Sequence, residues 1–176
     1  MKILTKTGFL AMAAVTASTA GCGSTAATSA GTPVGCSTAG AAATAASADY
    51  RYVLDVGPTE EMYSKAEVAG RHPKTGEVML NGAMTMAPGP NAQHLEVHIC
   101  AKGNGHAVTG APPTITVSDT TANTTAPIRV ATMQGVTSGP ADVHYGNNVD
   151  APPGHSFVVQ VAFRAQQAAL HFTRAH

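Results

Sequence analysis

The chain of 176 residues contains no tryptophan, three cysteines, and charged side chains at only 11% of its positions. It has no basic run and no basic patch rich in aromatic residues, so we expect no nucleic-acid partner. Beyond the N-terminal segment, no apolar run is long enough to span a bilayer. Because tryptophan and a Cys–Trp–Cys pattern are both absent, an antibody-type domain has no support.

The first residues have the organisation of an export signal. Lys2 and Lys6 precede an apolar stretch at 9–15, which is too short for a permanent membrane helix. We therefore predict a signal peptide over residues 1–21. Its removal leaves eight basic residues against ten acidic ones, a net charge near −2.

Cys22 directly follows small residues and is the predicted lipidation site, as in the lipobox of bacterial lipoproteins. Thr19 stands where that box usually has leucine, so ordinary secretion is the alternative. The expected location is the cell envelope outside the cytoplasm, with a lipid anchor to the membrane.

Residues 22–48 are almost all small and include no charged residue. Such a segment buries too little to offset its ordering entropy, so it is predicted to be a low-complexity tether. Residues 49–176 are then one domain. Cys36 and Cys100 form a disulfide in one interpretation. In the others, Cys100 is a small, half-buried residue or, less favoured, a metal thiolate.

The domain is predicted to be all-β, an immunoglobulin-like β-sandwich of about seven strands. Short segments with alternating apolar residues are separated by Gly and Pro clusters, which is typical of sandwiches. A short helical turn, capped by Thr59, is expected over 59–69. The predicted strands are 50–56, 77–83, 94–101, 114–118, 128–133, 157–163 and a last one around 168–172.

The strand at 94–101 carries the most informative pattern. Leu95, Val97 and Ile99 alternate with His94, Glu96 and His98, so the second face presents two imidazoles around a carboxylate. These groups bind metal ions. The plainer interpretation is that a half-buried sheet simply needs a polar outer face.

A further histidine, His144, begins the segment His-Tyr-Gly-Asn-Asn-Val at 144–149. Met84 and Met86 precede His94, and Met133 precedes His144. A ligand set of thioether and imidazole groups suits copper, although methionine is more often a core residue. The predicted metal site therefore contains His94 and His144, with Met84, Met86, Glu96 and His98 as further ligand candidates, and its ion is copper or iron. The site requires the His94 and His144 rings to lie within about 8 Å, because metal–nitrogen bonds are near 2 Å.

The segments at 94–99 and 144–149 resemble the signatures of periplasmic iron/copper-transport proteins of the P19/Tp34 type. That family has an HLEADI-like strand and a later HYGxN turn before a strand that begins with Pro-Gly, as Pro153-Gly154 does here. The resemblance implies an immunoglobulin-like sandwich, which in that family often forms a homodimer, a mixed Met, His and carboxylate metal site, and a membrane permease as partner. It assigns metal binding to His94, His144 and Met86. The family's upstream carboxylate has no clear match, and Glu60, Glu61 and Glu67 are candidates.

Two other functions fit the same residues. A structural or interaction module on a tether would use 144–147 as a turn, with Gly146 in a positive-φ conformation. A superoxide dismutase-type enzyme is disfavoured because His94 and His98 are not a His-x-His pair. Gly-x-Ser-x-Gly and His-Glu-x-x-His motifs are absent as well. We expect a protein that is not an enzyme.

Overall fold

A computed structural model of the chain describes residues 34–85 and 89–176. The predicted signal peptide, the predicted lipidation site Cys22 and the candidate ligand Met86 lie outside the described residues. Within these two ranges, no helix combines the length and the apolar character that crossing a membrane requires.

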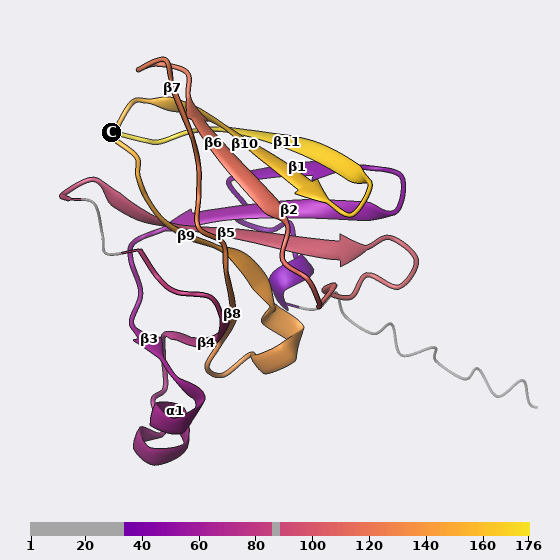
Figure 1. Ribbon diagram of the computed structural model, residues 1–176, viewed down its shortest axis with the longest axis vertical. Coiled ribbons are helices and arrows are strands. Elements are labelled where there is room, and N and C mark those ends of the chain that lie inside the picture. The colour runs from indigo at the N-terminus through magenta and orange to yellow at the C-terminus, as the bar shows by residue number, and fades with distance from the viewer. Residues whose placement is uncertain (1–33, 86–88) are drawn as a thin grey trace, which may run out of the picture. The chain divides into compact units, whose positions relative to one another are not determined.

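The described chain is all-β, with two sheets that face each other across one core (Figure 1). The larger sheet has the strand order β1-β2-β5-β9-β8-β4-β3, and the smaller has the order β11-β10-β6-β7. Neighbouring strands are antiparallel except for β3 and β4. The larger sheet contains β1 (Ala43–Ala46), β2 (Tyr50–Gly57), β3 (Met62–Tyr63), β4 (Glu77–Asn81), β5 (Ala92–Ala101), β8 (Ala131–Gly135) and β9 (His144–Asp150). The smaller contains β6 (Thr114–Asp119), β7 (Thr124–Pro127), β10 (Ser156–Phe163) and β11 (Gln166–Thr173).

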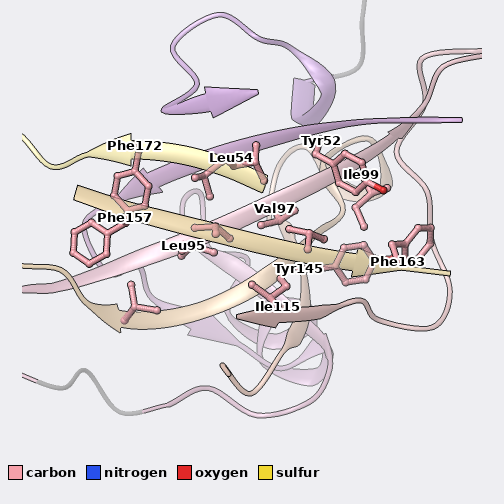
Figure 2. Close-up of a cluster of buried hydrophobic side chains, with 14 of the residues drawn as sticks. Tyr52, Leu54, Leu95, Val97, Ile99, Ile115, Tyr145, Phe157, Phe163 and Phe172 are labelled. Atoms are coloured by element: carbon pink, nitrogen blue, oxygen red, sulfur yellow. The ribbon is translucent and has the colours of Figure 1, made fainter. Parts of the chain in front are cut away.

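The core lies between the sheets and is built from alternating residues of both. Leu95, Val97 and Ile99 of β5 are fully buried there, as the sequence pattern predicted. Figure 2 shows them beside aromatic residues of the opposite sheet, including Phe157 and Phe163 of β10. Each fully buried side chain of this size contributes about 1.5–3 kcal/mol, so this interface is the main source of stability. It also orients the other face of β5 away from the smaller sheet.

Six of the predicted strands occur within a few residues of their expected bounds, but the segment 128–133 differs. Here β7 ends at Pro127 in the smaller sheet, and β8 starts at Ala131 in the larger one. Residues 128–130 therefore carry the chain from one sheet to the other. Ile128 and Val130 still pack against the core, as alternate residues of an extended segment do.

The predicted helical turn is displaced toward its C-terminal end. Helix α1 covers Lys65–Arg71, and its N-cap is Ser64 rather than Thr59. The Ser64 side chain accepts a hydrogen bond from the Glu67 backbone, and the Glu67 carboxylate accepts one from the Ser64 backbone. This capping box satisfies two backbone donors at the start of the helix, which the isolated Thr59 cannot do.

The predicted tether is wrong for its described part, because residues 34–48 belong to the folded unit. A short 3-10 helix, η1 (Val34–Cys36), precedes β1, and β1 pairs with β2 along Ala43–Ala46. Strand pairing uses backbone groups and needs few large side chains, so a composition of small residues did not reveal it. The chain is also fastened covalently, since Cys36 and Cys100 form a disulfide.

The disulfide settles the interpretations that the sequence left open for Cys36 and Cys100. Both residues are fully buried in a small cluster with Val53, on the face of β5 opposite the main core. Arg51 reinforces the attachment, because its guanidinium donates to the Cys36 carbonyl at 2.8 Å. The bond thus holds η1 against the face that carries His94 and His98.

We predict that replacing Cys36 and Cys100 together by serine lowers the free energy of unfolding by about 2–5 kcal/mol, because the bond closes a long loop of the unfolded chain. The two cysteines are 64 residues apart. Urea unfolding of the full chain measures the change. A Cys22→Ser variant, which keeps both partners of the bond, is the control and should unfold like the unmodified chain. Equal stability of all three proteins would contradict the prediction.

Candidate metal centre

The outer face of the larger sheet holds a buried polar layer. His94 and His98 on β5, His144 on β9 and Glu77 on β4 are all buried, although they point away from the main core. The segments η1 and η2 (Gly139–Asp142) contact each other beside this layer, and η1 also contacts β5. Burial of an entire polar cluster costs free energy unless its groups are paired or bind an ion.

Glu77, His94 and His144 form what we call the inner site. The Glu77 carboxylate lies between the two imidazoles: Oε2 is 3.3 Å from His94 Nε2, and Oε1 is 3.0 Å from His144 Nε2. The two ring centroids are 6.2 Å apart, which meets the distance that shared ligation requires. In a tetrahedral site with bonds near 2.1 Å, ligand atoms lie about 3.4 Å from one another. The spacing of the inner site therefore fits a small metal ion.

Three atoms of the inner site are buried and unpaired among the described residues. They are Glu77 Oε2, His94 Nε2 and His144 Nε2, none of which has a hydrogen-bond partner. Each such group ordinarily costs about 1–3 kcal/mol, and more when charged. Their convergence means that one cation placed among them would satisfy all three.

The second ring nitrogen of each histidine fixes which atom is free to bind a metal. His144 Nδ1 lies 2.9 Å from the Asp142 carbonyl, which can only accept, so Nδ1 carries the proton. Asn148 donates its amide to the Thr85 carbonyl at 3.1 Å, which turns its Oδ1 toward His94 Nδ1 at 3.0 Å. In the neutral rings, both Nε2 lone pairs therefore point to the Glu77 carboxylate. This is the orientation that metal-binding histidines have in proteins.

The electrostatics of the inner site keep the Glu77 carboxylate charged. Burial raises the pKa of Glu77, but the His144 and His94 imidazoles outweigh it and lower that pKa to about 2. Burial lowers the pKa of His94, and the Glu77 carboxylate reverses this and raises it. Glu77 therefore stays ionised in the interior beside the two imidazoles.

A second group, which we call the outer cluster, consists of Asp55, Glu96 and His98. His98 Nε2 lies 3.4 Å from Asp55 Oδ2 and 3.6 Å from Glu96 Oε2. Burial lowers the pKa of His98, but Asp55 and then Glu96 outweigh it and raise that pKa to about 9. The His98 and His144 ring centroids are 5.2 Å apart, so the three imidazoles form a row with His144 in the middle.

The remaining predicted ligands have different positions. Met84 is half-buried, and Met86 lies outside the described residues. Met133 is fully buried and is the cross-strand partner of His144, so its side chain shares the face of that histidine. Among the proposed upstream carboxylates, Glu60 is exposed, and its pKa is raised by partial burial and by the charge of Glu77.

Sequence reasoning missed Glu77, the carboxylate of the inner site. It was expected only as the first residue of a strand, and the signal that could have found it is an acidic residue beginning an otherwise apolar strand. Asn148 and Asp142 were also missed as the groups that orient the histidines. Their contacts depend on strand register, which the sequence did not supply.

Gly146 has a role that differs from its expected one. The segment 144–147 is strand rather than turn, and Gly146 does not have a positive φ. A Cβ at this position would lie 1.7 Å from the Leu95 carbonyl oxygen. The absence of a side chain allows β9 to approach β5 closely enough to bring His144 beside His94.

Asn147 holds the same strand from its other side. It is fully buried, donates to the Ala83 and Arg129 carbonyls at 3.0 and 2.6 Å, and accepts from the Thr85 backbone at 2.7 Å. A buried amide with all these partners fixes the position of the chain around it. Asn147 thus connects β9 to the segment that contains Met84 and Thr85.

Comparisons with protein-family models, with curated proteins and with solved structures found no match. The resemblance to the P19/Tp34 type stays a prediction. The structure establishes an all-β sandwich with buried His and Glu groups that could bind a metal ion.

We predict that Gly146→Ala destabilises the chain by more than about 3 kcal/mol, because backbone on β5 must move to admit the new carbon. Thermal unfolding of the purified full chain measures the effect. Gly57→Ala is the matched control, since a Cβ there meets nothing within 4 Å and Gly57 has no positive φ. Similar melting temperatures for the two variants would show that β5 and β9 do not depend on this close approach.

Proposed function

We propose that this protein binds a transition-metal ion outside the cytoplasm, as an envelope-anchored lipoprotein that captures copper or iron for uptake or homeostasis. The observation that carries the proposal is the convergence of His94 Nε2, His144 Nε2 and Glu77 Oε2, all buried and unpaired. Each histidine also has its other nitrogen held by an oxygen acceptor.

The ligand types of the inner site limit which metal ions it can bind. Two imidazoles and a carboxylate suit Cu(II), Zn(II) and iron, whereas Cu(I) prefers sulfur. Met133 lies on the face of His144 and offers a thioether nearby. We propose copper(II) or iron as the cargo, with Glu77, His94 and His144 as ligands and Asn148 and Asp142 as the groups that orient the rings.

The proposed location rests on the N-terminal sequence and on the disulfide. An apolar segment followed by Cys22 is typical of lipoprotein export. The Cys36–Cys100 bond supports an oxidising compartment, because disulfides persist mainly outside the cytoplasm. A membrane permease that receives the ion, and a homodimeric state, are further parts of the proposal that the P19/Tp34 resemblance implies.

Metal binding is tested on the purified full chain, stripped with a chelator and then dialysed against Cu(II). We expect at least one tightly bound ion and an electron paramagnetic resonance spectrum with hyperfine coupling to nitrogen. His94→Gln combined with His144→Gln should remove that signal and weaken binding by at least about 100-fold, since two of three ligands are lost.

His171→Gln is the matched control, because His171 is an exposed histidine on β11. It should bind Cu(II) as the unmodified chain does. Absence of metal uptake by the unmodified chain would reject the proposal. The folded domain would then be a structural or interaction module in which the histidines only stabilise the sheet.

A further inference from the structure

The short helix η1 lies directly against the polar layer that contains the inner site. Gly35 is buried, and a Cβ there would lie 2.5 Å from His98 Nδ1 and 2.9 Å from Asp142 Oδ1. A side chain at this position would push both groups away, so the contact is made by backbone alone. Because Asp142 is the last residue of η2, η1 supports η2 at this point.

Asp142 carries this contact on to the inner site. Its backbone carbonyl accepts the hydrogen bond from His144 Nδ1 at 2.9 Å, and this bond leaves Nε2 of the same ring free to face Glu77. If η2 moved, the Nδ1 proton would lose its acceptor, and the ring would be free to carry its proton on Nε2, where it blocks metal binding. One residue, Asp142, therefore connects η1 to a metal ligand.

The attachment of η1 to the sheet depends mainly on one covalent bond. The disulfide joins Cys36 to Cys100 of β5, and the Arg51 guanidinium donates to the Cys36 carbonyl at 2.8 Å. After Cys36 the chain passes through the exposed residues 38–40 before it reaches β1. Breaking the disulfide would therefore leave η1 on an exposed connection with a single hydrogen bond from Arg51.

The surroundings of the disulfide suit a pair of thiols. Arg51 is the direct cross-strand partner of Cys100, and its Nε is buried without a hydrogen-bond partner among the described residues. A guanidinium beside a cysteine favours the thiolate form. The reduced pair would thus have a cationic partner that the disulfide leaves unused. The half-buried Ala41 and Ala107 pack on the cluster that contains the bond, so part of its cover consists of small side chains.

We propose that the Cys36–Cys100 bond is a redox switch for the inner site, and that its reaction partner is a dithiol reductant. One thiolate of the dithiol attacks a sulfur of the bond and forms a mixed disulfide, and the second thiol of the dithiol then releases the chain. The dithiol is oxidised to a disulfide, and the two cysteines take up its two electrons and two protons. Reduction frees η1, Asp142 loses its support, and the metal affinity of the inner site falls. This last step rests on the proposed function.

The thiol step is tested without metal. The full chain is equilibrated with mixtures of reduced and oxidised dithiothreitol, free thiols are alkylated, and the alkylated fraction of Cys36 and Cys100 is measured by mass spectrometry. Both cysteines should react while the circular dichroism of the sheets is retained. Arg51→Gln should lower the equilibrium constant for reduction by about tenfold, because the guanidinium that favours the thiolate is gone.

Arg71→Gln is the matched control, since Arg71 is an exposed arginine of α1, and it should be reduced like the unmodified chain. Arg51→Lys keeps the positive charge and should retain most of the effect, so it replaces Arg51→Gln if that variant does not fold. Reduction that occurs only together with unfolding of the sheets, or equal constants for the Arg51 variants, the control and the unmodified chain, would overturn the switch.

The metal step is tested with two proteins that both carry Cys22→Ser, one of them with Cys36→Ser and Cys100→Ser as well. The serine pair imitates the open form and adds no thiol that could bind metal. Zn(II) is the probe because it has no redox chemistry. Calorimetry should show Zn(II) binding at least about tenfold weaker without the disulfide, since a ligand loses the group that orients it. The proton resonance of His144 Nδ1 should be lost or shifted in the same protein.

Gly35→Ala keeps the disulfide and pushes Asp142 away, so it gives the same comparison if the serine protein does not fold. Weaker Zn(II) binding together with a changed His144 resonance supports the switch. Equal affinity in both proteins rejects the switch and leaves the proposed function intact. If neither protein binds Zn(II), the proposed function fails, and an unchanged His144 resonance would then show that the disulfide does not control η2 either.

Discussion

The structure of the site depends on one carboxylate held between two imidazoles inside the protein. Glu77 lies within 3.3 Å of His94 and 3.0 Å of His144, in a layer where water does not compete. Its charge is expensive to bury, and the neighbouring rings keep its pKa low enough that the charge persists. The sheet must therefore hold strands β4, β5 and β9 in fixed register, because a slip of one residue would turn each of these side chains to the opposite face.

That register is enforced from both sides of the sheet. On the inner side, Leu95, Val97 and Tyr145 are fully buried in the core between the sheets. On the outer side, the Cys36–Cys100 bond holds η1 beside His98. The polar layer is consequently enclosed by segments that contribute little apolar surface, and covalent attachment compensates for this.

The row of His94, His144 and His98 connects two groups of polar side chains that have different surroundings. The inner site has two nitrogens and one buried carboxylate, and the outer cluster has two partly exposed carboxylates and one nitrogen. A single strand, β5, supplies residues to both groups because alternate residues share one face.

The sequence by itself determined the all-β class, the strands with alternating apolar residues, and the candidacy of His94 and His144, since these follow from local periodicity and side-chain chemistry. In the structure, the pairing of Met133 with His144 places both side chains on the face opposite the core. Only the tertiary structure decided that β4 brings Glu77 to the histidines, that Gly146 is required by a close strand contact, and that residues 34–48 join the fold. These features depend on pairings between segments far apart in the chain, and neither composition nor periodicity encodes which strands become neighbours.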